Sequence, residues 1–153
     1  MQFVLEPPNG VLDIRLGVTL SAVAEVLWRY GDIEEFQRTP EAPPGWVARG
    51  DGVTIFVYSD SAGMADAIEF ARPTDPTTDQ VTFGGVNLFA EPADTVVELL
   101  TRAGVRLHAE EGGRAYTAPD LLISFWRDGG PEGPDGLPVY WESVLVARPG
   151  YYD

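Results

Sequence analysis

The chain has 153 residues, of which 24 are Asp or Glu and 10 are Arg, and its formal net charge at pH 7 is −14. It contains no cysteine and no lysine, which excludes disulfides, thiolate metal sites, cysteine nucleophiles and lysine Schiff bases. The negative charge would repel a phosphate backbone, so we predict no nucleic-acid partner and favour a basic protein as the partner.

The N-terminal residues lack the basic and long apolar regions of a signal peptide, and no stretch approaches the roughly twenty apolar residues of a membrane helix. We therefore predict a cytoplasmic protein without a membrane partner. The sequence has neither an EF-hand pattern nor a phosphate-binding glycine loop. We expect no cofactor and no metal, and the sequence leaves the oligomeric state open.

The first half of the chain predicts one helix and several strands. Leu20, Val23 and Leu27 recur at helical spacing, and the helix is expected to end near residue 30. Thr19 can cap its start, while Gly31 suits the left-handed conformation at its end. Apolar alternation and turn residues predict strands at 11–16, 33–38, 46–49, 53–58 and 67–72.

The second half follows a polar segment at 73–79 that proline interrupts twice. This segment is the only convincing linker, and it places a boundary near residue 77. Pro92 suits the first turn of a second helix, Asp94 favours the positive end of that helix, and Gly104 closes it. Strands are expected at 81–88, 105–109, 114–118, 121–126 and 139–148.

Similar segments recur in the same order in the two halves of the chain. The clearest is DAIEFARP, which recurs as ESVLVARP with the same apolar alternation and the same Ala-Arg-Pro ending. A helical segment and a strand-like segment recur as well. The pairs are 66–73 with 142–149, 23–31 with 96–104, and 53–60 with 121–128.

This recurrence predicts an α+β fold made of two tandem repeats, each a helix packed on a sheet of about four antiparallel strands. The repeats would span 1–76 and 77–153. One helix on so thin a sheet cannot bury both of its faces. We therefore expect the two repeats to form one unit that shares a core or a continuous sheet.

The segment 15–19, RLGVT, followed by Val23 in a helix, resembles the Leu-Gly-x-Thr opening of the SmpA/OmlA family of outer-membrane assembly lipoproteins. The layout of two helix-and-sheet repeats is also similar to β-lactamase inhibitory protein, whose repeats form a concave sheet that grips its target. The chain differs from that inhibitor because it has no cysteine and no evident secretion signal. The resemblance therefore implies neither a periplasmic location nor β-lactamase as the target, and it transfers no functional residue.

The sequence offers no recognisable catalytic site. His108 is the only histidine, and no nucleophile elbow accompanies it. The acid pairs, Glu34 with Glu35 and Glu110 with Glu111, are adjacent in sequence, so their side chains point in opposite directions along a strand, which is poor geometry for acid–base cooperation. We therefore predict a protein that is not an enzyme and has no catalytic residue.

Aromatic side chains indicate a binding surface instead. Phe56 and Tyr58 share one face of the strand at 53–58, and Leu122 and Trp126 share one face of its counterpart. If the helices cover the β-branched faces, these residues lie on an open face, where aromatics anchor partners. The alternative is that the second face is also buried, which would make the same residues part of the core. The candidate binding residues are Phe56, Tyr58, Leu122, Trp126, Tyr140 and Trp141.

Three classes of function remain. The first is a non-catalytic protein-binding module, such as an inhibitor or immunity protein whose acidic face neutralises a basic protein. The second is a binder of a small apolar or aromatic ligand between the repeats. The third is an enzyme that uses two converging carboxylates, one of them with a raised pKa. The acidity, the repeat and the missing catalytic motifs favour the first class.

Overall fold

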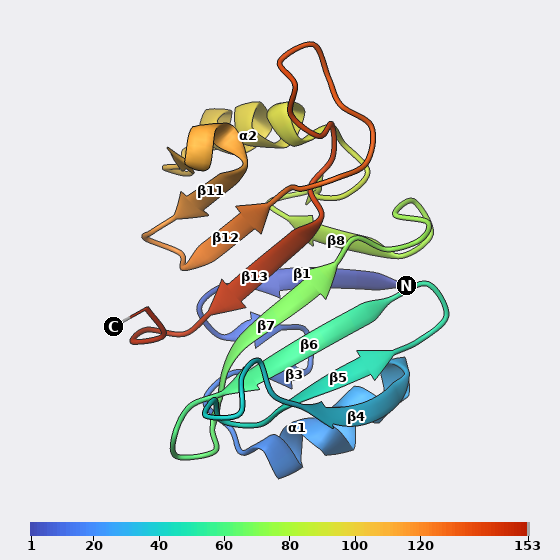
Figure 1. Cartoon of the computed structure of the whole chain (residues 1–153), viewed down its shortest axis with the longest axis vertical. Helices are drawn as coiled ribbons and strands as arrows, with labels where there is room; N and C mark the ends of the chain where they lie inside the picture. Colours follow the sequence, from blue (N-terminus) through green and yellow to red (C-terminus); the bar gives the residue numbers. More distant parts are fainter. Residues whose placement is uncertain (153) are drawn as a thin grey trace.

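The structure is a computed structural model and describes residues 1–152. It is an α+β protein with two β-sheets and two short α-helices (Figure 1). Strands are antiparallel to their neighbours except for one parallel pair in the smaller sheet. Within the described residues, neither helix has the length and apolar character needed to cross a membrane.

The larger sheet contains eight strands: β4 (Asp32–Phe36), β5 (Gly45–Arg49), β6 (Thr54–Ser59), β7 (Ala65–Ala71), β10 (His108–Glu110), β11 (Ala115–Ala118), β12 (Ile123–Trp126) and β13 (Ser143–Ala147). Their order across the sheet is β10-β11-β12-β13-β7-β6-β5-β4. Strands from the first half of the chain therefore lie on one side, strands from the second half lie on the other, and β7 pairs with β13 in the middle (Figure 1).

The smaller sheet contains five strands: β1 (Gln2–Glu6), β2 (Gly10–Val11), β3 (Ile14–Arg15), β8 (Gln80–Phe83) and β9 (Val86–Asn87). Their order is β3-β2-β1-β8-β9. The pairing of β1 with β8 is parallel and places Phe3 opposite Val81. This sheet therefore also joins the beginning of the chain to its second half.

Two short helices lie at opposite ends of the molecule, with the smaller sheet between them (Figure 1). α1 (Leu20–Leu27) begins at Thr19, whose hydroxyl accepts a hydrogen bond from the Ala22 N–H at 3.2 Å. A 3-10 turn at Trp28–Tyr30 extends it. α2 (Ala93–Arg102) begins after Pro92.

The hydrophobic core lies between the larger sheet and a layer made of the smaller sheet and the helices. The ring of Phe3 in β1 packs on that of Phe70 in β7, with their centroids 5.0 Å apart. Leu27 of α1 and Leu100 of α2 belong to the same cluster of buried residues. Burial of these apolar side chains on one face of the larger sheet stabilises the layers against each other.

The structure corrects several predicted boundaries. The segment 11–16 forms two short strands rather than one, because Leu12 has a φ of 49° and turns the chain. The segment 81–88 is likewise divided, since Gly84 and Gly85 both adopt positive φ between β8 and β9. Both corrections add a reversal where apolar alternation alone indicates a continuous strand.

The sequence does not predict β1 or the five-stranded sheet around it. The parallel pair of β1 and β8 joins segments that are far apart in the chain, and a local pattern cannot reveal such a partner. The last strand also starts later than predicted, at Ser143 rather than at residue 139. The residues before it run irregularly beside Arg72, whose N–H donates to the carbonyl of Glu142 at 2.8 Å.

We expect Phe70→Ala to lower the free energy of unfolding by about 3–5 kcal/mol, because this ring is fully buried and couples the two sheets through Phe3. Leu99→Ala is the matched control, since that side chain is 36% exposed on α2, and it should cost less than about 1 kcal/mol. Urea denaturation followed by tryptophan fluorescence measures both. Equal losses from the two substitutions would contradict this description of the core.

Candidate functional site

The two faces of the eight-stranded sheet carry different side chains. Residues directly opposite each other in paired strands lie on the same face, so the register arranges them in rows across the sheet. One row consists of Ile55, Phe70, Val144 and Phe125. All four are buried, and this face of the sheet forms the core.

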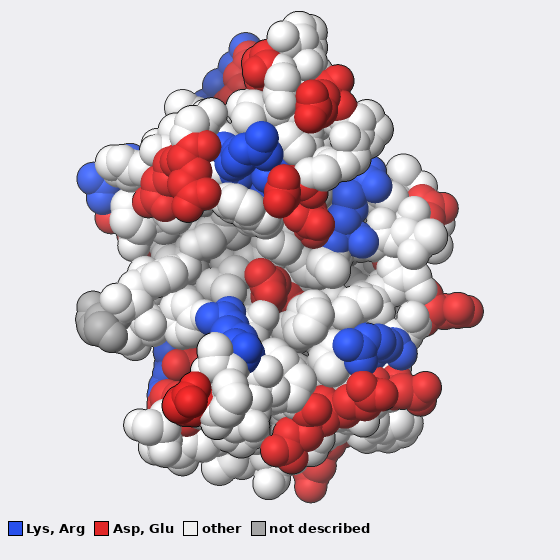
Figure 2. All heavy atoms as spheres, viewed as in Figure 1, with Lys and Arg blue, Asp and Glu red and all other residues white. Residues whose placement is uncertain are grey.

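The opposite face is turned toward the viewer in Figures 1 and 2, and among the described residues no helix or second sheet covers it. Its middle row consists of Phe56, Glu69, Leu145 and Ser124. The helix-facing side therefore holds the β-branched and aliphatic residues of β6, and the open side holds the aromatic ones.

The two middle strands carry small side chains on this open face. Ala67 and Ala71 come from β7, and Ser143 and Ala147 come from β13 and lie directly opposite them. Only Glu69 and Leu145, which pair with each other between these positions, are larger. The centre of the open face is therefore recessed, because the side chains there are short.

The flanking strands carry large side chains on the same face. Phe56 and Tyr58 come from β6, Trp126 comes from β12, and Leu122 lies just before β12; all four are half-buried. Figure 2 shows the open face hollowed across its middle, with charged residues of both signs along its border. We call this hollow the central groove. Its floor is Ala67, Glu69, Ala71, Ser143, Leu145 and Ala147, and its walls are Phe56, Tyr58, Leu122 and Trp126.

The C-terminal tail fills one end of the central groove. Tyr151 packs on Ala67, Leu145 and Ala147. The hydroxyl of Tyr152 lies 2.5 Å from the Ser124 hydroxyl. The other end of the floor, at Ala71 and Ser143, is only half-buried and remains open.

A polar cluster links one wall of the groove to its floor. The Tyr58 hydroxyl donates to Oε1 of Glu69 at 2.6 Å. Burial, and then the hydrogen bond to Glu69, raises the pKa of Tyr58, so this hydroxyl stays protonated and remains a donor at neutral pH. The guanidinium of Arg38 lies over the Tyr58 ring, 3.7 Å from its centroid.

Two carboxylates lie near the filled end of the groove. Asp60 accepts hydrogen bonds from the N–H groups of Met64 at 3.0 Å and Ala62 at 2.9 Å and pairs with Arg148; the Met64 bond is the largest of the effects that lower the pKa of Asp60. Burial, and then the charge of Asp60, raises the pKa of Asp66, whose Oδ1 is buried without a hydrogen-bond partner.

Carboxylates whose pKa values are pushed apart are typical of acid–base pairs. A catalytic pair also needs room for a substrate beside it. Within residues 1–152, neither Asp60 nor Asp66 lines the pockets beside Tyr140, Leu137, Tyr152 or Asp75. We therefore assign them no catalytic role.

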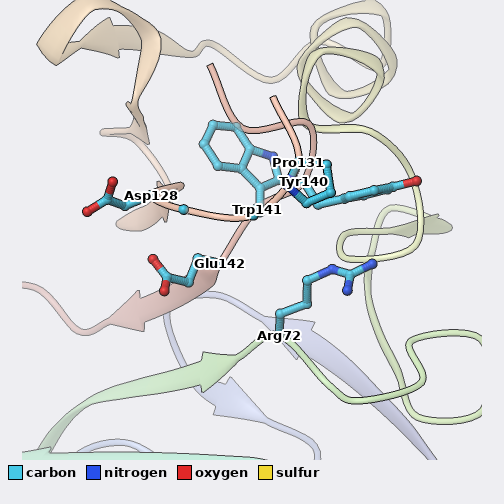
Figure 3. A pocket seen from close by; sticks show the side chains of 8 residues that line it. Arg72, Asp128, Pro131, Tyr140, Trp141 and Glu142 are labelled. Atoms are coloured by element: carbon cyan, nitrogen blue, oxygen red, sulfur yellow. The ribbon is translucent and has the colours of Figure 1, made fainter. Parts of the chain in front are cut away.

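The open end of the central groove leads to a pocket of about 220 Å³. Arg72 follows β7 and Glu142 precedes β13, so the two charges extend the middle strands beyond the groove floor. The Tyr140 ring lies over Arg72, with its centroid 4.5 Å from the guanidinium carbon, whereas the Glu142 carboxylate points away from both (Figure 3). One positive and one negative side chain, Arg72 and Glu142, therefore lie at the open end of the central groove.

The structure brings four of the six candidate binding residues together in the walls of the central groove, namely Phe56, Tyr58, Leu122 and Trp126. Tyr140 is half-buried and lines the adjoining pocket. Trp141 is different, because its side chain is fully buried. Its ring packs on Phe125 at 5.4 Å and Tyr116 at 5.8 Å in the core, so it is not available as a surface contact.

The sequence reasoning missed the floor of the groove. Glu69, Ala71 and Ser143 lie in the two copies of the recurring Ala-Arg-Pro segment, and the recurrence alone predicts only two strands that end alike. A signal was present, because two strands of similar sequence can pair with each other in an antiparallel sheet. That pairing would place both sets of small residues side by side.

Within residues 1–152, no group of three or more His, Asp or Glu side chains is arranged to hold a metal ion. His108 is exposed on the edge strand β10, opposite Thr117 of β11. It lies on the same face as the central groove but outside its walls. The chemistry that this face offers is therefore apolar contact, hydrogen bonding and charge pairing.

Asp66→Asn is expected to raise the midpoint of thermal unfolding at pH 7. Folding raises the pKa of Asp66 above its ordinary value of 3.8. This carboxyl therefore stabilises the folded state fully only when the pH is below 3.8, and that stabilisation is lost as the pH rises through the pKa of the folded state. The advantage of the variant should therefore vanish near about pH 3. Circular-dichroism melts across this range measure it, and a variant less stable than wild type at pH 7 would contradict the account.

No family model, curated protein or solved structure matches this chain. The resemblance to the assembly lipoproteins and to β-lactamase inhibitory protein therefore stays a prediction from the sequence. The functional argument rests on the central groove and on the charges around it.

Proposed function

We propose that this protein is a non-catalytic protein-binding module that holds a loop or extended segment of a basic partner in the central groove. The observation that carries this proposal is a floor of small residues between aromatic walls, on a sheet face that no helix or sheet within residues 1–152 covers. Large aromatic residues contribute strongly to binding when a partner excludes water from them. A floor of Ala and Ser also lets a partner backbone approach closely.

The proposal includes two tandem repeats, 1–76 and 77–153, that share one sheet. A helix followed by four antiparallel strands occurs as α1 with β4 to β7 and again as α2 with β10 to β13. Glu69 and Leu145 hold equivalent positions in the recurring segment and pair directly across β7 and β13. An approximate twofold axis between these strands accounts for both facts, and it supports the resemblance to the two-repeat inhibitor.

Charge supports a basic partner. Eight of the 10 arginines form ion pairs with carboxylates of the same chain, so little positive charge is left to offset the surplus of acids. An acidic surface accelerates encounter with a basic protein and suppresses binding of acidic ones. An inhibitor or immunity protein that acts in the cytoplasm is the class that fits this proposal.

A small apolar ligand between the repeats is the second candidate. The pocket where Arg72 of the first half meets Tyr140 of the second has a volume of about 220 Å³, below the roughly 300–1,000 Å³ typical of ligand pockets. A pocket of about 380 Å³ beside Leu122, Ser124 and Tyr152 is large enough. It lies within the second half alone, however. A pocket of about 420 Å³ does join the two halves, but it is lined by Asp51, Asp75 and Asp79 rather than by apolar side chains, so the pockets favour the protein-binding proposal.

Affinity capture from a lysate of the source organism tests the proposal, with wild type, Ala71→Trp and Ser21→Trp as baits at low and moderate salt. Ala71→Trp fills the open part of the floor, whereas Ser21 is exposed on α1 and adds the same ring elsewhere. We expect wild type and Ser21→Trp to retain one stoichiometric basic protein, Ala71→Trp to retain at least about tenfold less, and rising salt to release it.

Two outcomes would contradict the groove proposal. One is equal retention of the same protein by all three baits, which would place the binding surface elsewhere. The other is a retained partner that is acidic and insensitive to salt. Thermal melts of the three baits provide the control for folding, because Ala71 and Ser21 are not part of the buried core.

A further inference from the structure

We propose that Glu69 is the recognition point for one cationic side chain of the partner, an Arg guanidinium or a Lys ammonium that enters the central groove. This inference rests on the proposed function, because it names the chemistry that the groove recognises. It goes beyond the general acidity of the chain, since it assigns one carboxylate at one position.

The position of Glu69 sets it apart from the other acids. It lies on β7 at the middle of the eight-stranded sheet, and its direct neighbours in the row are Phe56 and Leu145. It is the only charged residue in the groove floor. The equivalent position in the second half holds Leu145. Of these two residues, which face each other across the approximate axis, only Glu69 is charged.

The one side-chain hydrogen bond that Glu69 accepts within residues 1–152 leaves its carboxylate able to bind a cation. Tyr58 donates to Oε1 at 2.6 Å and fixes the carboxylate against the wall. No side chain of residues 1–152 forms an ion pair with Glu69, although most arginines of this chain are paired with acids. A half-buried carboxylate without a counterion gains more from a partner cation than an exposed one does, because water screens it less.

The surroundings of Glu69 suit a long basic side chain. Ala71 and Ser143 are small and half-buried, and they leave the floor beside Glu69 open. Phe56 and Trp126 on the walls offer apolar surface for the aliphatic stem and ring faces for the cation. Arg38 over the ring of Tyr58 is an example of the same contact within this chain.

The test uses short random peptides displayed on phage and selected against the full chain. Recovered peptides are then synthesised, and their dissociation constants are measured for wild type, Glu69→Gln, Glu25→Gln and Ala71→Trp. Glu25→Gln makes the same change of charge on the exposed side of α1. It therefore separates the local effect of Glu69 from the overall field of the protein.

We expect the recovered peptides to be enriched in Arg or Lys next to apolar residues. Glu69→Gln should weaken their binding about tenfold or more, since a charge-assisted hydrogen bond is lost from a partly buried site, and Glu25→Gln should change it less than about twofold. Replacing the basic residue of a peptide by Gln should remove most of the effect of Glu69→Gln, which is the coupling expected for direct contact.

Each contrary result has its own meaning. If Ala71→Trp abolishes peptide binding and Glu69→Gln does not, the groove proposal stands and the role of Glu69 is wrong. If neither variant affects binding, the groove proposal fails and the inference fails with it. A selection that enriches no peptide, or only peptides without a basic residue, also overturns the inference.

Discussion

The antiparallel pairing of β7 with β13 is the contact on which the rest of the structure depends. It joins two groups of four strands into one sheet, from Ser143 opposite Ala71 to Ala147 opposite Ala67. If β7 shifted by one residue in its pairing, all of its side chains would move to the opposite face of the sheet, and Glu69 would enter the core. The same pairing therefore fixes the core and the floor of the central groove.

An uncovered apolar face is a risk for aggregation, and the chain limits that risk at the edges of its sheet. The edge strand β4 carries Asp32, Glu34 and Glu35, and the opposite edge strand β10 has only three residues. Charged or short edges discourage pairing with a second sheet. The groove lies away from both edges, so apolar surface is concentrated where β7 and β13 hold it rigidly, which suits a surface meant for one partner.

Much of the open face follows from the sequence, because strict alternation in β6 and β12 separates Phe56 and Trp126 from the β-branched residues. The role of Glu69 does not follow, since it depends on two distant copies of one segment pairing with each other. Trp141 is misplaced for a related reason. It precedes β13 in an irregular segment, where alternation assigns no face. β1 is not predicted from the sequence, because its partner β8 lies far along the chain.

Site-specific photo-cross-linking tests the central claim most directly, and a chain without cysteine is well suited to it. A benzophenone attached at Glu142→Cys would stand in the pocket at the open end of the groove and leave the floor free, while the same group at Glu25→Cys would stand on α1 after the same change of charge. The account predicts that only the probe beside the groove cross-links to one basic partner, at a peptide that contains Arg or Lys. Equal cross-linking from both positions, or none from Glu142→Cys while the partner is bound, would contradict it.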